Sequence, residues 1–403
     1  MDAEGGARAA GVLFAARALR TFAFGAASLV LALHLVGRGL TAAQVGGVFT
    51  ACLVEDALLT MAVASWGQRL GARRILIAAS GVVCATGVLL ALGPTPTVAM
   101  TAVVMGVLSP SGQDAGPFST FEVAQLAGRV TGAARTRAFS WYNLASFVPS
   151  ALGALAAGAW LAVARRRGLS DDSAYRVVFA VYAAAGAGLA ALYVRFAPDD
   201  AAVSAPARAF GLHRSRRVVL QLTALQALDA LAGGFVVQSL LVYWFHLRFG
   251  VGPEALGLVF FGTNVLSAVS FLAAARIAER WGLLHTMVFT HLPSNVLLML
   301  VPFAPGFGIA VALLLTRHLL SQMDVPTRQA YTMALVEPDE RPAAAGLAVS
   351  VRGLAQAVAP ALTGWALAGA ATGLPFLLAG GLKIVYDLAL FARFRRVVLP
   401  SQA

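Results

Sequence analysis

Apolar runs of about 20 residues, the length of a membrane-spanning helix, recur along the whole chain, and short polar or Gly/Pro-rich joints separate them. Hydrophobic residues make up 59% of the 403 positions and charged residues only 12%. A soluble domain is roughly half apolar and about a quarter charged. The sequence therefore predicts an all-α polytopic membrane protein.

The order of runs and breaks predicts about twelve transmembrane helices. The longest polar connection, "RFAPDDAAVSAPARAFGLHRSRR", follows the sixth run and predicts a linker between two six-helix bundles. We expect an N-terminal bundle at 1–197, a cytoplasmic linker at 198–216 and a C-terminal bundle at 217–403. The expected spans are 12–36, 43–66, 74–92, 96–126, 138–163, 176–197, 217–247, 254–277, 284–303, 306–334, 343–369 and 373–394.

The two halves of the chain repeat each other. A shift of about 210 residues superposes short motifs in the same order, and a parallel repeat of two helical units is a known transporter plan. The repeat therefore predicts two pseudo-symmetric bundles. The matching pairs are "GGVF" (46–49) with "GLVF" (257–260), "QRLG" (68–71) with "ERWG" (279–282), "SGQD" ending at Asp114 with "SQMD" ending at Asp324, and Pro149-x3-Gly153-x4-Gly158 with Pro360-x3-Gly364-x4-Gly369.

The formal net charge is +12, from 30 basic and 18 acidic residues. On a soluble protein this balance suggests a nucleic-acid partner. Here the arginines gather at the ends of the apolar runs, where positive charge sets membrane orientation. They predict cytoplasmic termini, with one exception in the outer joint "ARRRGLSDDSAYR", and no nucleic-acid partner. The Ala/Arg-rich, Lys-poor usage indicates a GC-rich genome and the plasma (inner) membrane of a prokaryote.

Several kinds of chemistry have no signature in the sequence. Cys52 and Cys84 lie inside apolar runs and indicate neither a disulfide nor a metal site. There is no G-x-x-x-x-G-K-[ST] loop for ATP and no His/Cys/acid cluster for a catalytic metal. The outer joints are too short for the catalytic domain of a membrane-embedded transferase. We therefore expect no enzyme activity and no cofactor, and we expect the first helix to act as the insertion signal.

The joint between the second and third runs, "ASWGQRLGARR", resembles the loop signature of the major facilitator superfamily, roughly G-x-x-x-D-R-x-G-R-R. Arg69, Gly71 and Arg73 match the signature, whereas Gln68 stands where the signature has Asp. The glycine permits a tight turn between antiparallel helices. The second half contains a copy, "ARIAERWGLLH", which retains an acid, an Arg and a Gly.

The resemblance implies the fold and alternating access of the superfamily. In that plan the first, fourth, seventh and tenth spans line the cavity, and the second, fifth, eighth and eleventh flank it. The alternative is that the loop arginines are only orientation signals that face anionic headgroups or helix C-termini. The expected inner-gate residues are Arg69, Gly71, Arg73, Asp114, Glu122, Glu279, Arg280, Gly282, Asp324 and Arg328.

Charged residues inside the apolar runs point to function, because an ionised side chain in hydrocarbon costs several kcal/mol. Four basic and four acidic residues lie near the membrane centre, and this balance predicts ion pairs. We expect Lys383 to pair with Asp387, and Asp324 with Arg328, because four residues separate each pair on a helix. The central set is Arg20, Glu55, Asp56, Asp229, Arg317, Arg352, Lys383 and Asp387.

Arg20 and Asp229 occupy nearly equivalent positions in the two halves. They either face each other across the pathway or pair within their own halves. Arg317 is the leading candidate for holding an anionic group of the substrate, because guanidinium binds carboxylate or phosphate through two hydrogen bonds. His318 beside it either titrates near neutral pH or serves a structural role.

Glu55 and Asp56 are consecutive, so their side chains lie about 100° apart around a helix. The superfamily plan packs the second span against the eleventh, which carries Arg352 at a similar depth. Our hypothesis is that one acid pairs with Arg352 while the other faces the cavity and exchanges protons; the alternative is a structural network. The second half has Ser267 at the position of Asp56 and Asn264 nearby, so the acids belong to one half only.

These features predict a secondary transporter that moves a small solute by alternating access and is driven by protons. The arginines favour an anionic or zwitterionic solute, and the resemblance favours efflux over uptake. One alternative is a multidrug antiporter that exchanges lipophilic cations for protons. Another is a non-coupled facilitator or a transporter-like sensor. The expected partners are the solute, protons and the lipid bilayer, and we expect a monomer.

Overall fold

The computed structural model describes residues 3–112, 116–129, 132–196, 212–337 and 339–397. Within these ranges the chain is built of helices and contains no strand. It divides into two compact units. Unit 1 comprises Met1–Pro206 and Val237–Phe261, and unit 2 comprises Ala207–Val236 and Gly262–Ala403.

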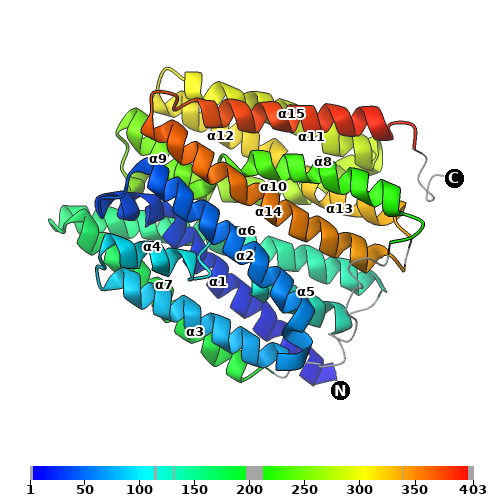
Figure 1. Ribbon diagram of the computed structural model, residues 1–403, viewed down its shortest axis with the longest axis horizontal. Helices are drawn as coiled ribbons and strands as arrows, with labels where there is room; N and C mark the ends of the chain where they lie inside the picture. Colours follow the sequence, from blue (N-terminus) through cyan, green and yellow to red (C-terminus); the bar gives the residue numbers. More distant parts are fainter. Residues whose placement is uncertain (1–2, 113–115, 130–131, 197–211, 338, 398–403) are drawn as a thin grey trace. The chain divides into compact units, whose positions relative to one another are not determined.

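In unit 1, α1 packs along α6 and α3 packs along α7 (Figure 1). The short helix α9 also belongs to this unit and contacts α1. The helices of unit 1 are α1 (Ala3–Gly37), α2 (Ala42–Leu70), α3 (Ala72–Ala91), α4 (Pro96–Val104), α5 (Pro117–Arg129), α6 (Gly132–Arg166), α7 (Asp171–Val194), α9 (Gln238–Phe249) and the beginning of α10 (Pro253–Trp281).

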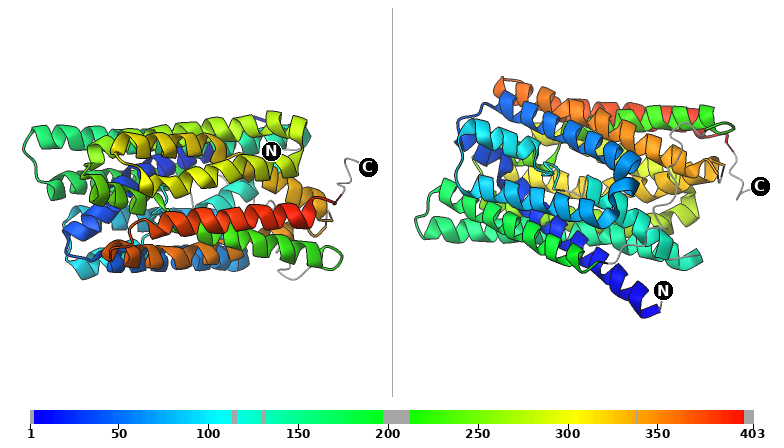
Figure 2. Two further views of the ribbon diagram at one scale, coloured as in Figure 1. Left: turned by 90° about the horizontal axis from the view of Figure 1, so that it is seen from above. Right: turned by 60° about the horizontal axis from the view of Figure 1, so that its bottom comes forward.

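In unit 2, α8 packs against α14 and α15, and α11 packs against α12, α13 and α15 (Figure 2). The helices of unit 2 are α8 (Arg216–Gly234), the remainder of α10, α11 (Leu283–Leu300), the 3₁₀ turn η2 (Val301–Phe303), α12 (Phe307–Ser321), α13 (Asp324–Leu335), α14 (Arg341–Ala368) and α15 (Leu374–Phe394). The linker expected at 198–216 lies largely outside the described residues, so the bundle boundaries stay a prediction.

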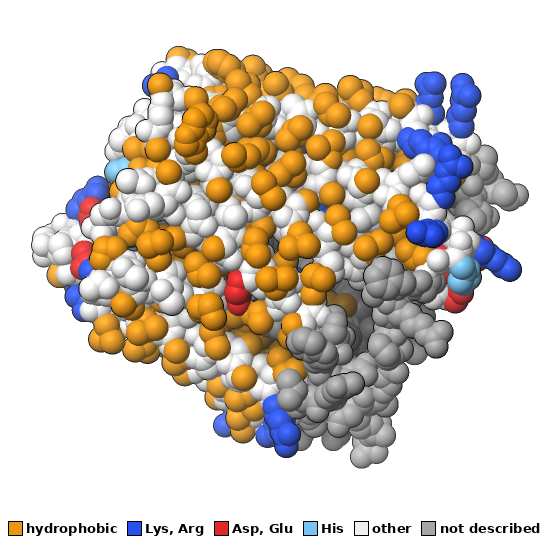
Figure 3. Space-filling view, in the orientation of Figure 1, with side chains coloured by type: hydrophobic (Ala, Val, Ile, Leu, Met, Phe, Trp, Pro, Cys, Tyr) orange, Lys and Arg blue, Asp and Glu red, His pale blue; other side chains and the backbone are white. Residues whose placement is uncertain are grey.

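Ten segments of the described chain are long and apolar enough to cross a membrane, and α8 and α9 together form one of them. On the face drawn in Figure 3, hydrophobic side chains cover most of the described surface, while Lys and Arg side chains stand near its margins. Both observations confirm an all-α polytopic membrane protein. The expected spans 96–126, 217–247 and 306–334 are not single helices, because each consists of two shorter ones.

The break between α4 and α5 follows from the turn-forming residues of "SPSGQDAGP". Gly112 and Gly116 have φ angles of 67° and 86°, which a glycine adopts without steric cost. Val107 has a φ of 48°, which is strained for a β-branched residue. The fourth span therefore holds a non-helical segment, whose described residues are 105–112 and Gly116.

Helices α1 and α6 touch backbone to backbone. A Cβ atom on Gly153 would lie 2.0 Å from the carbonyl oxygen of Phe22, and one on Gly25 would lie 2.2 Å from that of Ser150. Small residues permit such close helix packing in membranes, where the hydrophobic effect does not drive helices together.

We expect Gly153→Ala to lower the free energy of unfolding by about 1–3 kcal/mol, because the new methyl group forces α1 and α6 apart. Gly47→Ala on α2 is the matched control, since nothing lies within 4 Å of its Cβ position. The control is expected to raise stability by about 0.5–1 kcal/mol. Unfolding of the purified protein in detergent micelles measures both, and equal effects would contradict the backbone contact.

Candidate functional site

Asp229 is the centre of an ion cluster in unit 2. It lies on α8, and only 4% of its surface is exposed. Its Oδ1 accepts a hydrogen bond from Lys383 Nζ at 2.5 Å, and its Oδ2 accepts from Arg328 Nη1 at 2.9 Å and from Arg352 Nη1 at 3.2 Å. Four helices, α8, α13, α14 and α15, therefore meet at one carboxylate.

A second acid belongs to the same cluster. Arg328 also donates to Asp324, four residues earlier on α13, at 2.8 Å, which confirms the expected pair. Arg352 donates in addition to the carbonyl oxygen of Gln226 at 3.2 Å. Two carboxylates thus face three cations, which leaves a surplus of one positive charge.

The expected pair between Lys383 and Asp387 is wrong. Asp387 instead lies 2.9 Å from His291 Nδ1 and accepts a hydrogen bond from Asn295 Nδ2 at 3.0 Å. Lys383 and Asp387 are one turn apart on α15, but the first points to α8 and the second to α11. Each of these two side chains therefore binds residues of a neighbouring helix and not the other member of the expected pair.

Arg20 and Glu122 form a buried network in unit 1. Both side chains are fully buried, and the guanidinium donates to the carboxylate twice, at 2.9 and 2.7 Å. The hydroxyls of Tyr142 and Tyr193 each donate to Glu122 at 2.5 Å. The Arg20 guanidinium also lies 4.7 Å from the centroid of the Phe118 ring.

Arg20 and Asp229 are thus each paired within their own unit. Of the two expected arrangements, the structure has the local one, because Glu122 and the cations around Asp229 supply nearer partners. Glu122 lies in this buried network, and its expected place near the inner gate stays a prediction.

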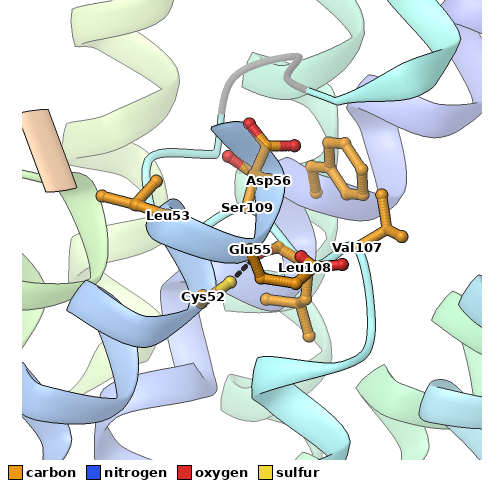
Figure 4. A pocket seen from close by; sticks show the side chains of 8 residues that line it. Cys52, Leu53, Glu55, Asp56, Val107, Leu108 and Ser109 are labelled. Atoms are coloured by element: carbon orange, nitrogen blue, oxygen red, sulfur yellow. Dashed lines mark hydrogen bonds between the residues drawn. The ribbon is translucent and has the colours of Figure 1, made fainter. Parts of the chain in front are cut away.

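Glu55 and Asp56 lie on α2 beside a small pocket in unit 1 (Figure 4). The two side chains point in different directions, as the helical spacing predicts. One oxygen of Glu55, Oε2, is buried without a hydrogen-bond partner among the described residues. Asp56 lies against the non-helical segment, where its Oδ1 would be 2.6 Å from a Cβ on Gly116.

The pocket has about 10 Å³ of interior space, about enough for one water molecule. Its wall combines α1, α2 and the non-helical segment. The lining residues are Phe24, Cys52, Leu53, Glu55, Asp56, Val107, Leu108 and Ser109.

The carbonyl groups of the non-helical segment are bonded to side chains of surrounding helices. Cys52 Sγ on α2 donates to the Leu108 carbonyl at 2.9 Å, and Tyr182 on α7 donates to that of Val107 at 3.3 Å. Ser150 on α6 donates to the Gly112 carbonyl at 2.8 Å. At membrane depth, irregular backbone is stable only where protein groups satisfy it in this way.

Helix α9 completes this arrangement. The Ser239 backbone N–H donates to the carbonyl of Pro110 at 3.0 Å. The Ser239 hydroxyl donates to the carbonyl of Ser28 on α1 at 2.9 Å, and Gln238 Nε2 donates to the hydroxyl of Ser28 at 2.8 Å. The segment is therefore held by α2, α6, α7 and α9.

The expected pair between Arg352 and one of the α2 acids joins residues of different units and stays a prediction. The hydrogen bonds of Arg352 in the described chain go to Asp229 and to the Gln226 carbonyl, both on α8. The acids of α2 and Arg352 belong to different units.

Arg317 and His318 lie on α12 in unit 2. Arg317 is 8% exposed, and its Nη1 lies 3.3 Å from His318 Nε2. His318 Nδ1 lies 3.0 Å from the hydroxyl of Ser267 on α10. Ser267 is the position equivalent to Asp56 in the sequence repeat, and Asn264 is buried on the same helix.

The loop glycines adopt the conformation that the signature requires. Gly71 and Gly282 precede α3 and α11 with φ angles of 82° and 79°, so the repeat extends to the turn geometry. Arg73 donates to the Val194 carbonyl at the end of α7, where a cation favours the helix dipole. Glu279 and Arg280 are exposed. Asp114 and the side chain of Arg69 lie outside the described residues.

Sequence reasoning missed Glu340, which precedes α14. Its carboxylate accepts hydrogen bonds from the backbone N–H groups of His213, Arg214 and Ser215 at 3.0, 2.7 and 2.9 Å. Burial alone would raise the pKa of Glu340, but these hydrogen bonds outweigh it and lower the pKa to about 2. The residue thereby ties the beginning of α8 to the beginning of α14. An acid placed just before "RPAA" is the sequence signal for such a helix start.

The sequence matches known proteins over most of its length. Residues 13–320 match the family model described as Major Facilitator Superfamily. The "Uncharacterized membrane protein YJR124C" of Saccharomyces cerevisiae is 25% identical over 419 residues, which cover 95% of this chain and 93% of the yeast protein.

Solved transporters share the fold at low identity. A bacterial homologue of the human lysosomal transporter Spinster has a TM-score of 0.75 at 14% identity and covers 99% of this chain and 100% of its own. The xylose transporter XylE of E. coli has a TM-score of 0.73 at 12% identity and covers 98% of each chain. The nucleoside transporter NupG has a TM-score of 0.71 at 13% identity, with 96% of this chain and 99% of its own covered. Because the family match spans more than half of the sequence, this chain belongs to the Major Facilitator Superfamily.

Proposed function

We propose that this protein is a secondary transporter that carries a small solute by alternating access and couples its movement to protons. The family supports secondary transport. Solved structures of the same fold include transporters of xylose and of nucleosides, which supports a small solute. The resemblance to the superfamily favours efflux. The arginine distribution favours cytoplasmic termini, and the Ala/Arg-rich, Lys-poor usage favours the plasma membrane of a prokaryote.

One observation carries the proton coupling: Glu55 Oε2 is buried at the pocket without a hydrogen-bond partner among the described residues. An ionised carboxylate in that position is costly, whereas the neutral acid is not. Glu55 therefore takes up a proton when the pocket is closed to water and releases it when water enters. This exchange is the step that couples a proton to a conformational cycle.

The surroundings of Glu55 support this role. Its neighbour Asp56 lines the same pocket, so two carboxyl groups share one small space. The pocket has space for about one water molecule, and a water there can relay the proton. Strained Val107 lines the same pocket, and local strain is common where a segment changes conformation.

Purified protein in liposomes with a pH-sensitive dye inside tests the coupling. A panel of organic anions, cations and sugars is screened for solute-dependent proton flux. We expect Glu55→Gln to abolish the proton flux and to leave exchange of the solute in place, because the amide mimics the neutral acid. Glu337→Gln, which changes an exposed acid, is the matched control and is expected to behave as the wild type.

The outcomes separate the alternatives. Unchanged proton flux in Glu55→Gln would contradict the role of Glu55. Downhill solute flux without proton movement in the wild type would indicate a non-coupled facilitator. Proton flux with lipophilic cations alone would indicate a multidrug antiporter.

A further inference from the structure

Unit 2 contains more positive charge at membrane depth than its carboxylates neutralise. Within α8 and α11–α15, leaving aside the exposed helix ends, four cations face three carboxylates among the described residues. The cations are Arg317, Arg328, Arg352 and Lys383, and the carboxylates are Asp229, Asp324 and Asp387.

Each of the carboxylates already has partners. Asp229 and Asp324 bind the other three cations of this set, and Asp387 is held by His291 and Asn295. Arg317 has no carboxylate within salt-bridge distance among the described residues. Its surface is 8% exposed, and its Nε has no hydrogen-bond partner in the same part of the chain.

His318 fixes the orientation of this guanidinium. Arg317 has only donors, so His318 Nε2 accepts the hydrogen bond from its Nη1 at 3.3 Å. The proton of the neutral imidazole is then on Nδ1, which donates to the Ser267 hydroxyl at 3.0 Å. The edge formed by Arg317 Nε and Nη2 is left unoccupied by these contacts.

We infer that Arg317 forms an anion-binding subsite in unit 2, which holds a carboxylate or phosphate group of the transported solute. The open edge of a guanidinium matches two oxygens of such a group. The anion also compensates a buried cation that has no carboxylate within salt-bridge distance in the described chain. The solute is therefore an organic acid, a zwitterion or a phosphate ester. This inference rests on the proposed transport function, but its test does not require transport.

The test is thermal unfolding of the purified full chain in detergent with sodium phosphate or sodium acetate, against sodium chloride of equal ionic strength. For the wild type we expect phosphate or acetate to raise the melting temperature until the effect saturates, because an anion that binds only the folded state stabilises it. Saturation by acetate points to a carboxylate group, and saturation by phosphate points to a phosphate group.

Three variants distinguish a binding role from a structural one. Arg317→Gln is expected to melt at a higher temperature than the wild type in chloride and to lose the shift with either anion, because an uncompensated buried charge is removed. Arg317→Lys keeps the positive charge but loses the two adjacent N–H donors of the guanidinium. We expect it to weaken the apparent affinity for the anion about tenfold. Arg328→Gln, which removes the partner of two acids, is expected to lower the melting temperature in every buffer.

Specific results would overturn the inference. An identical shift in wild type and Arg317→Gln would place the anion elsewhere, and the absence of any shift in the wild type would exclude the subsite. Glu55→Gln is expected to keep the anion shift. A retained shift without proton flux in the wild type would contradict the proposed coupling but leave the anion subsite standing.

Discussion

Asp229→Asn is expected to lower the free energy of unfolding by about 3–5 kcal/mol, the usual cost of breaking a buried ion cluster by removing one partner. The reason is that Lys383 and Arg352 have Asp229 as their only carboxylate partner among the described residues. Arg328 retains Asp324. The measurement is unfolding of the purified variant in detergent micelles against the wild type.

A second substitution provides the control for this prediction. In the double variant Asp229→Asn with Lys383→Met, the cation that lost its carboxylate partner is replaced by an apolar side chain of similar length. We expect this double variant to recover most of the lost stability. A loss below about 0.5 kcal/mol for the single variant, the range of ordinary surface substitutions, would contradict the central position of Asp229.

Glu122→Gln is expected to have an effect of similar size, about 3–5 kcal/mol, because it removes the carboxylate to which the fully buried Arg20 donates two hydrogen bonds. Adding Arg20→Gln removes the remaining charge, and the amide introduced at position 122 still offers an acceptor to the hydroxyls of Tyr142 and Tyr193. We expect this double variant to recover most of the stability.

Transport by the double variant decides what the pair is for. A stable double variant that still carries solute indicates a structural pair. A stable variant without transport indicates that the Arg20 and Glu122 charges act in the pathway or gate. Equal stability of wild type and Glu122→Gln would contradict the buried pair itself.

The apolar runs predicted where the chain crosses the membrane but not where a span breaks. In the expected spans 96–126 and 306–334 the helix after the break is more polar than the helix before it, but each run is long enough to be assigned as one span. The turn residues of "SPSGQDAGP" were the available signal for the first break. The second break, at Gln322 and Met323, comes just before Pro326, which is tolerated in the first turn of a helix but not in the interior of a longer one.

The ion-pair prediction is confirmed where the spacing along one helix determines the partner, and it is wrong where the packing of neighbouring helices determines it. Asp324 and Arg328 are on one helix and pair as their spacing requires. Lys383 and Asp387 have the same spacing, but the rotation of α15 directs them to Asp229 and His291. A sequence does not contain that rotation explicitly, because it is set by the packing of α8, α11 and α15.

The depth of Glu55 and Asp56 in the membrane could likewise be predicted, as could their divergence around α2. Their surroundings could not, since part of the pocket wall is the non-helical segment of the fourth span. Its hydrogen bonds come from Cys52, Ser150 and Tyr182, none of which has a motif that marks such a role.

The bonds from α9 to Ser28 and Pro110 have a consequence for biosynthesis. At ~5–20 residues per second, α9 leaves the ribosome on the order of ten seconds after the fourth span. Until then the Pro110 carbonyl and the Ser28 hydroxyl lack the partners that Ser239 and Gln238 provide. The first six spans therefore enter the bilayer as an unfinished assembly, and a nascent chain halted before α9 is an expected target of membrane quality control.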